Sequence, residues 1–293
     1  MGTLPSGSAA KLPTAWVTGA GGLIGSTLAR TAATQAQEWS VRALPRYELD
    51  LTDFSAVRQR FRQEQPALVI HCAAISQSPP CQANPALAHK VNVEVTTLLA
   101  ELAADVPFVF FSSDLVFDGR RGNYEETAAV NPLSVYAETK VAAEHLVQVN
   151  PKHTIIRTSL NGGVSPTGDR GFNEQMRRTW KGGQSLKLFT DEFRCPIAAE
   201  VTARAVWALV AKKAAGVFHV AGSERLSRWQ IGRLVAARWP ELNPKIEPAS
   251  LKEYQGAPRP ADASLNCDKV QKLLSFPLPR LTDWLSAHPH EEF

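Results

Sequence analysis

The sequence contains few cysteines, and they lie far apart. Cys72, Cys81, Cys195 and Cys267 form no C-x-x-C pair, and no histidine stands at zinc-ligand spacing from them. This spacing argues against a metal site and against a disulfide framework, so we expect no metal ligands and reduced thiols. Reduced thiols in turn predict a cytoplasmic location.

Long apolar runs and a large charge excess are also missing. No run of apolar residues is long enough to span a bilayer, and residues 1–13 lack the apolar centre of a signal peptide, which predicts a flexible N-terminus there. The 32 Lys and Arg residues against 28 Asp and Glu residues leave a net charge of +4, and the basic residues are scattered. We therefore expect neither a nucleic-acid nor a membrane partner, but a small-molecule substrate.

Short apolar runs alternate with helical patterns through the first half of the 293 residues. The runs at 15–19, 39–44, 67–74, 108–113 and 153–159 show no in-out alternation, which is typical of strands buried on both faces. Helices between them require parallel pairing with right-handed crossovers. The pattern predicts an α/β fold, a Rossmann-type doubly wound parallel sheet, with the nucleotide-binding core over residues 14–159.

The second half is less regular and predicts a smaller C-terminal lobe. Residues 160–293 begin with loop-like sequence and contain shorter helical patterns, one of them preceded by Ser227 as a candidate N-cap. A helix followed by GVFHVAG, over about residues 198–222, is predicted to return to the sheet. The remainder of this half would form a substrate-binding lobe.

A glycine-rich turn follows the first strand. TGAGGLIG places Gly19, Gly22 and Gly25 before an amphipathic helix. Glycines at this spacing let the turn close and let the backbone approach a pyrophosphate, while the helix N-terminus offers free N–H donors. The strand before the turn and the helix after it favour a dinucleotide site over a merely structural turn.

The end of the second strand bears on which dinucleotide binds. Arg42 and Arg46 come before any carboxylate there, and an arginine at this place favours a cofactor with a 2′-phosphate. We expect NADP(H) to be favoured, with NAD(H) left open because either arginine could be a solvated surface charge. Asp50 and Leu51 begin the next loop, where contact with the adenine is expected, and Asp53 is a candidate helix cap.

Tyr136 and Lys140 lie on one face of a predicted helix, because they are four residues apart. A nearby ammonium and a cationic nicotinamide would lower the pKa of the phenol, and a shift of about three units corresponds to about 4 kcal/mol. Ser113 ends the buried run FVFFSS, at the strand end where open α/β sheets bind ligands. Its hydroxyl would hydrogen-bond a substrate carbonyl while Tyr136 delivers a proton.

These pieces together resemble the extended short-chain dehydrogenase/reductases, and within them the dTDP-4-dehydrorhamnose reductase-like (RmlD-like) branch. The matching segments occur in the order VTGAGGLIG, DLTD, HCAA, VN, FSSDLVFDG, YAETK, IIRTS and RPADASLNCDK. The resemblance implies Ser113, Tyr136 and Lys140 as the catalytic trio, with Asn92 ordering a proton-relay water. It also implies cofactor contacts from the glycine loop, the second strand end, the HCAA segment and the catalytic helix, at Gly19, Gly22, Leu23, Ile24, Gly25, Arg46, Asp50, Leu51, Ala73, Ala74, Asn92, Tyr136 and Lys140.

Departures from the family pattern narrow the chemistry. Related dehydratases carry a second acid, Glu, where this chain has Leu115, so reduction or epimerisation of a keto group fits better than dehydration. Leu160 and Asn161 replace a Trp and an aromatic residue common in the rhamnose reductases, and Ser134 stands where Asn is common. The hypotheses are an NAD(P)-dependent keto reductase, an epimerase with the same trio, and a regulatory subunit that binds cofactor without turnover.

Substrate contacts are predicted from polar residues near the nicotinamide end. Guanidinium groups bind diphosphates in fork geometry, which suits a nucleotide-activated sugar. The candidates are Asp114, Asn173, Arg177, Arg194 and Arg259. His71 and His219 lie within apolar runs and are predicted to be core residues, and a homodimer is expected at the level of the family.

Overall fold

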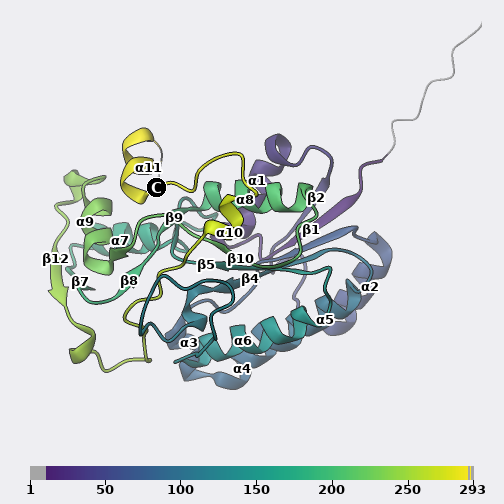
Figure 1. Cartoon of the computed structure of the whole chain (residues 1–293), viewed down its shortest axis with the longest axis horizontal. Helices are drawn as coiled ribbons and strands as arrows, with labels where there is room; N and C mark the ends of the chain where they lie inside the picture. Colours follow the sequence, from purple (N-terminus) through teal and green to yellow (C-terminus); the bar gives the residue numbers. More distant parts are fainter. Residues whose placement is uncertain (1–10, 290, 292–293) are drawn as a thin grey trace, which may run out of the picture.

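The computed structural model describes residues 11–289 and residue 291 of the chain. Residues 1–10, on which most of the predicted flexible N-terminus falls, lie outside the described residues. A six-stranded parallel sheet forms the centre of the fold (Figure 1). Its strands, in spatial order, are β10 (Gly216–Val220), β5 (Thr154–Thr158), β4 (Phe108–Ser113), β3 (Leu68–His71), β1 (Thr14–Thr18) and β2 (Ser40–Leu44).

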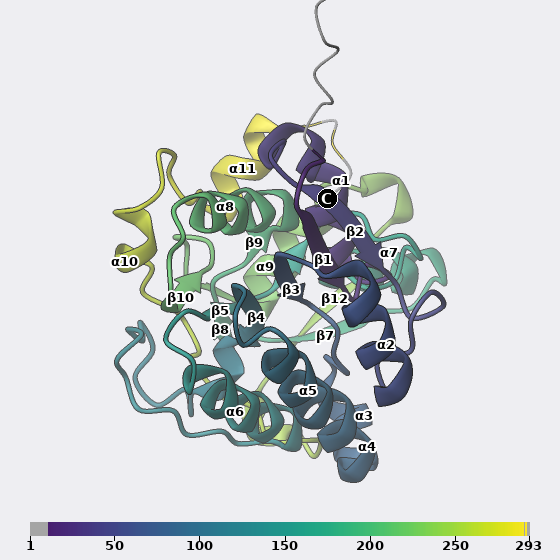
Figure 2. The same cartoon turned by 90° about the vertical axis from the view of Figure 1, so that its right-hand side faces the viewer.

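Helices cover both faces of this sheet, and Figure 2 shows them above and below the strands. One face is covered by α1 (Leu23–Gln35) and α8 (Ala199–Ala211), with the short α10 (Asp268–Gln271) against β10. The other carries α2 (Phe54–Glu64), α5 (Val95–Leu102) and α6 (Val135–Gln148), flanked by α3 (Ser78–Ala83) and α4 (Pro85–His89). The two apolar layers explain why β3 and β4 are buried at every residue. The predicted doubly wound fold is confirmed.

The strand order reverses between β1 and β3. The chain runs from β1 outward to β2 and then returns to place β3 on the other side of β1. In doubly wound sheets, ligands bind at the carboxyl ends of the strands at such a reversal. This point therefore locates the expected nucleotide site before any side chain is considered.

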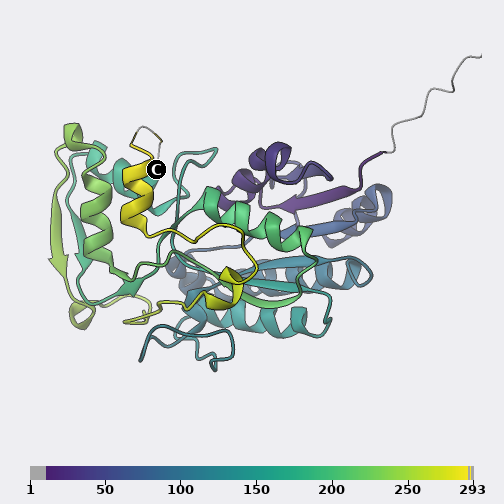
Figure 3. The ribbon, with the colours of Figure 1, turned by 45° about the horizontal axis from the view of Figure 1, so that its top comes forward.

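The second half of the chain builds a separate layer at one end of the sheet, on the left in Figures 1 and 3. Two-stranded pairs form from β6 (Asn161–Gly162) with β9 (Ile197–Ala198), β7 (Leu186–Phe189) with β12 (Ile246–Ala249), and β8 (Phe193–Arg194) with β11 (Leu226–Ser227). Its helices are α7 (Phe172–Lys181), α9 (Arg228–Ala236) and α11 (Leu281–Ala287). They share an apolar cluster of their own, around Trp180, Ile231 and Trp284.

One segment of this half belongs to the central sheet. Helix α8 packs beside α1, and β10 pairs with β5 from Gly216 opposite Thr154 onward. Ser227 caps α9 by accepting a hydrogen bond from the amide of Gln230, as its position in the sequence predicts. The division into a core and a substrate-binding lobe stays a prediction.

Between α4 and α5 the chain forms a π-helical turn, η1 (Lys90–Glu94), and three short 3-10 turns lie elsewhere in the described residues: η2 (Asp114–Val116), η3 (Pro240–Leu242) and η4 (Leu251–Glu253). In the part of the chain that the structure describes, none of the helices has both the length and the apolar character needed to cross a membrane.

Candidate active site

The glycine loop has a shape that only glycine permits at two positions. Gly19 has φ +69°, and a Cβ there would lie 2.5 Å from the amide nitrogen of Ala73. A Cβ on Gly25 would lie 2.5 Å from the carbonyl oxygen of Gly19. The loop therefore packs tightly against its own helix and against the chain after β3.

Helix α1 begins directly after this loop and has no side-chain cap. Gly22 is its N-cap residue, with Leu23 and Ile24 in the first turn, and that turn contains no acidic residue. The unpaired amides and the helix dipole favour an anion at this end. These features fit the pyrophosphate of a dinucleotide cofactor.

The chain after β3 supplies the opposite wall of the expected cofactor site. Ala73 touches Gly19, which brings the segment HCAA against the glycine loop. The two segments follow β1 and β3, the strands between which the order reverses. The structure thus brings the predicted Ala73 and Ala74 to the place where the topology locates a ligand.

The loop after β2 carries the predicted cofactor-selecting residues. Its start is fixed to the glycine loop, since the Gly19 amide donates to the Leu44 carbonyl. Arg46 pairs with Asp50 at 3.2 Å, and its side chain is 85% exposed. Arg42 instead pairs with Glu48 at 2.9 Å. Arg46 is therefore the better placed of the two arginines to meet a 2′-phosphate.

The predicted catalytic trio comes together at the carboxyl end of β4. Ser113 is the last residue of β4, whereas Tyr136 and Lys140 lie on α6. The Ser113 hydroxyl interacts with the Tyr136 phenol and lowers its pKa, and Nζ of Lys140 donates to the Phe111 carbonyl at 2.8 Å. Ser134 caps α6 by accepting from the Ala137 amide, so this departure from the family pattern preserves the start of the catalytic helix.

Burial dominates the proton affinities of this trio. It raises the pKa of Tyr136 to about 12; Asp114 adds to the rise, whereas the hydrogen bond with Ser113 and the charge of Arg194 oppose it. Burial also lowers the pKa of Lys140 to about 8, although Cys72 and Glu144 favour its charged form. The expected lowering of the Tyr136 pKa includes a bound nicotinamide and stays a prediction, whereas the chain's own groups raise this pKa. A neutral phenol is the form that donates a proton at neutral pH.

Asn92 connects the chain after β3 to the catalytic helix. It lies in a π-helical turn, Lys90–Glu94, between α4 and α5. Its amide accepts from the Ile75 nitrogen at 2.8 Å and donates to the Ile75 carbonyl and to the Thr139 hydroxyl. The side chain is thus engaged with protein groups, and the expected role in ordering a water stays a prediction.

Three of the predicted substrate residues join one chain of ion pairs, in which Asp114 and Arg194 are buried and Arg259 is 27% exposed. Arg194 donates through both Nε and Nη2 to Asp114, with Nε 2.6 Å from Oδ2. Arg259 makes the same two-pronged contact with Glu192, at 2.6 and 2.9 Å, and Glu192 lies 3.6 Å from Arg194. Ser113 donates to Asp114 at 3.2 Å, which joins the chain to the catalytic trio.

These pairings change the expected role of the guanidinium groups. The forks of Arg194 and Arg259 already face carboxylates, so the structure does not present them as free diphosphate ligands. Glu192, fully buried between them, is the residue that sequence reasoning missed. Burial alone would raise its pKa, but Arg259 holds it below the usual range, so Glu192 is charged.

The other two substrate candidates lie elsewhere in the second half of the chain. The Asn173 amide hydrogen-bonds both the nitrogen and the carbonyl of Gly163, at 3.2 and 2.9 Å. The Arg177 guanidinium lies over the Trp239 ring, 5.1 Å from its centroid. Neither residue joins the chain of ion pairs, and substrate contact by either stays a prediction.

The two strand histidines are core residues, as expected. His71 lies between the hydroxyls of Thr18 and Thr96, and burial lowers its pKa to about 3. His219 faces the Tyr124 carbonyl, and burial lowers its pKa to about 3 as well. Both rings are neutral at physiological pH and are not proton donors.

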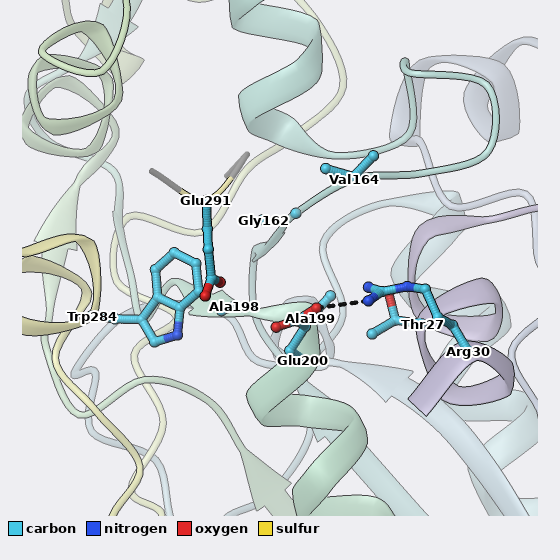
Figure 4. Close-up of a pocket in the computed structure, with 10 residues that line it drawn as sticks. Thr27, Arg30, Gly162, Val164, Ala198, Ala199, Glu200, Trp284 and Glu291 are labelled. Atoms are coloured by element: carbon cyan, nitrogen blue, oxygen red, sulfur yellow. Dashed lines mark hydrogen bonds and ion pairs between the residues drawn. The ribbon is translucent and has the colours of Figure 1, made fainter. Parts of the chain in front are cut away.

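A small cavity lies between α1, α8 and α11, beside the Gly163 that Asn173 contacts (Figure 4). The ion pair of Arg30 with Glu200 borders it on one side and Trp284 on the other. Its volume of about 40 Å³ holds a few water molecules, whereas ligand sites measure about 300–1,000 Å³. It is therefore not the cofactor site.

Comparison with known proteins agrees with this geometry. Residues 14–289 match the family model described as RmlD substrate binding domain. The chain belongs to this RmlD family. The predicted family is therefore confirmed, and the match covers both the sheet and the second half of the chain.

Relatives of this RmlD-family chain differ in their described roles. It is 32% identical to a probable low-salt glycan biosynthesis reductase from Haloferax volcanii, covering 93% of this chain and 96% of the relative. It is 30% identical to a dTDP-4-dehydrorhamnose reductase from Sinorhizobium fredii, covering 90% and 92%. It is also 28% identical to methionine adenosyltransferase 2 subunit beta from Xenopus laevis, covering 88% and 82%.

A solved structure shares the fold of this RmlD-family chain. The dTDP-4-dehydrorhamnose reductase from Bacillus anthracis, in complex with NADP, superposes with a TM-score of 0.84 at 23% identity, covering 94% of this chain and 98% of that one. This likeness agrees with the six-stranded sheet and its flanking helices.

Proposed function

We propose that this chain is an NAD(P)-dependent reductase of a keto group on a nucleotide-activated sugar. The observation that carries the proposal is the meeting of Ser113, Tyr136 and Lys140 at the end of β4. This end lies beside the strand reversal that locates the cofactor. Two relatives described as reductases agree with this chemistry.

The glycine loop fits a dinucleotide cofactor. The tight turn at Gly19, the close packing at Gly25 and the uncapped start of α1 form a cradle that side chains would fill. When bound, the nicotinamide supplies the hydride for carbonyl reduction. Arg46 favours NADP(H) over NAD(H), in agreement with the NADP-bound neighbour from Bacillus anthracis.

The chain's own residues handle the proton. Tyr136 donates its phenolic proton to the carbonyl oxygen, which the high pKa of the phenol permits at neutral pH. The Ser113 hydroxyl turns its hydrogen from Asp114 toward the same oxygen and polarises the carbonyl. Lys140, held by the Phe111 carbonyl, binds the cofactor ribose. Its positive charge also stabilises the phenolate that Tyr136 becomes after it has donated its proton.

The neighbourhood of Ser113 favours reduction over dehydration. The position after Asp114 is Leu115, so the strand end supplies no second carboxylic acid there. A nucleotide sugar with a 4-keto group is the substrate class that follows from the rhamnose reductase relative.

Turnover of a dTDP-4-keto-6-deoxy sugar with NADPH tests the proposal. We expect NADPH to be consumed in proportion to the reduced sugar, measured by absorbance and mass spectrometry. Epimerised sugar without net NADPH consumption would support the epimerase alternative. No change of the sugar, despite bound NADPH, would overturn the proposed reductase.

A second candidate function rests on the Xenopus laevis relative. The name of that relative, methionine adenosyltransferase 2 subunit beta, is that of a subunit and so agrees with the alternative of a regulatory subunit. The enzyme is favoured because the chain retains all of Ser113, Tyr136 and Lys140. A Tyr136→Phe variant distinguishes the two functions, because a regulatory subunit would keep its function without the phenolic hydroxyl whereas the reductase would lose its activity. The homodimer and the cytoplasmic location stay predictions, to be checked by light scattering and by fractionation.

A further inference from the structure

A buried ion pair joins the catalytic helix to the central sheet. Glu144 lies on α6 and Arg157 on β5, and their side chains are 2% and 4% exposed. Nε of Arg157 is 3.0 Å from Oε1 of Glu144, and Nη2 is 2.7 Å from Oε2. Figure 2 shows α6 running beneath β5, which carries Arg157, and beneath its neighbour β4.

The carboxylate lies on the same helix face as the catalytic residues. Tyr136, Lys140 and Glu144 follow one another at intervals of four, so they lie one turn apart along one side of α6. Lys140 fastens this side to β4 through the Phe111 carbonyl, and Glu144 fastens it to β5.

Arg157 also holds the segment that follows the catalytic strand. It is the partner of Ser112 in the sheet, one position before the partner of Ser113. Its Nη1 donates to the Glu126 carbonyl at 3.3 Å, and its guanidinium lies 5.1 Å from the centroid of the Phe117 ring. One side chain therefore contacts the catalytic helix, the sheet and the loop after Ser113.

A buried ion pair is a poor choice for stability alone. Burying two charges is costly, and well-packed apolar residues often give equal or greater stability. Its fork geometry, in contrast, fixes distance and orientation. We propose that Arg157 and Glu144 are positioning residues that set the placement of Tyr136 relative to Ser113; this inference rests on the proposed function.

A double apolar variant separates positioning from stability. In Glu144→Leu with Arg157→Met, neither member of the pair is left as an unpaired charge, so we expect thermal stability equal to or above that of the wild type. We expect kcat to fall at least about tenfold, with KM within about threefold, because misplaced catalytic groups slow the chemical step. Val147→Ala, one turn beyond Glu144 and fully buried, is the control that weakens α6 without changing its charges.

The dependence of NADPH affinity on pH distinguishes a loss of charge from a loss of packing, because a loss of packing alone would not change its midpoint. The charge of Glu144 favours the ammonium of Lys140, while Cys72 and Cys81 also face that group and His71 interacts with it. In Glu144→Gln, the midpoint of NADPH affinity against pH should therefore move below that of the wild type. Val147→Ala should leave the midpoint unchanged.

Hydrogen exchange of the 134–140 segment completes the test without requiring turnover. We expect faster exchange there in the double variant than in the wild type. Wild-type kcat in a stable double variant, or an unmoved midpoint together with unchanged exchange, would overturn the positioning role. A wild-type protein that binds NADPH but reduces no sugar would instead overturn the proposed function, with the midpoint and exchange measurements still deciding the role of the pair.

Discussion

Replacing Asp114 by Asn tests whether the chain of ion pairs holds the site together. The substitution keeps the shape of the side chain but leaves Arg194, 5% exposed, without its two-pronged carboxylate. Removing one partner of a buried ion pair costs about 3–5 kcal/mol. Glu192 remains 3.6 Å from Arg194, so we expect a loss at the lower end, about 3 kcal/mol in the free energy of unfolding.

The assay is urea unfolding of three variants. Asp114→Asn should lower the midpoint with an unchanged slope. Arg194→Met in the Asp114→Asn background should recover part of the loss, because the unpaired charge is then removed. Arg30→Met breaks an exposed pair and is the control, with an expected loss of less than about 1 kcal/mol.

A different result would refute this reasoning. If Asp114→Asn lost less than about 1 kcal/mol, or if the double variant were no more stable than the single one, Asp114 would not act as an ion-pair anchor. If Asp114→Asn raised KM but left the free energy of unfolding unchanged, Asp114 would instead be a substrate ligand, as the sequence predicts.

Three further predictions concern the cofactor. Gly19→Ala should weaken NADPH binding at least about tenfold, measured by calorimetry, because the added methyl group would clash with Ala73. Gly168→Ala is the matched control: Gly168 also has a positive φ, +68°, but lies in open space, so this variant should bind NADPH with wild-type affinity. NADPH affinity should fall as pH rises through about 8, where Lys140 loses its charge, and a Lys140→Met titration should show no such step. Arg46→Ala should reduce the thermal stabilisation by NADPH but not by NADH; equal losses would contradict its role at the 2′-phosphate.

Local pattern was sufficient to predict the framework. Continuous apolar runs predicted the buried strands. The helix caps at Asp53 and Ser227 were predicted from their positions directly before helical patterns. The glycine loop was predictable from the spacing of its glycines between a strand and a helix, whereas the contact of Gly19 with Ala73 joins distant segments and was not. The strand-end rule located only Ser113, and its meeting with Tyr136 was implied by the family resemblance.

Long-range pairs could not be read from the sequence. Glu192 lies 67 positions from Arg259, and only the folded chain shows that they neutralise each other. The π-helical turn at Asn92 has the same origin, since its amide is held by Ile75 from another segment. The pKa of Tyr136 depended on burial, which periodicity does not quantify.

The most direct test of the central claim is the kcat of Tyr136→Phe with NADPH and the keto sugar. Loss of a general acid typically costs about 10²–10⁴-fold in rate. We predict a fall of at least about a hundredfold, with NADPH affinity retained because Lys140 and the glycine loop are intact. A kcat within about threefold of the wild type would show that another group delivers the proton, and would contradict the assignment of Tyr136.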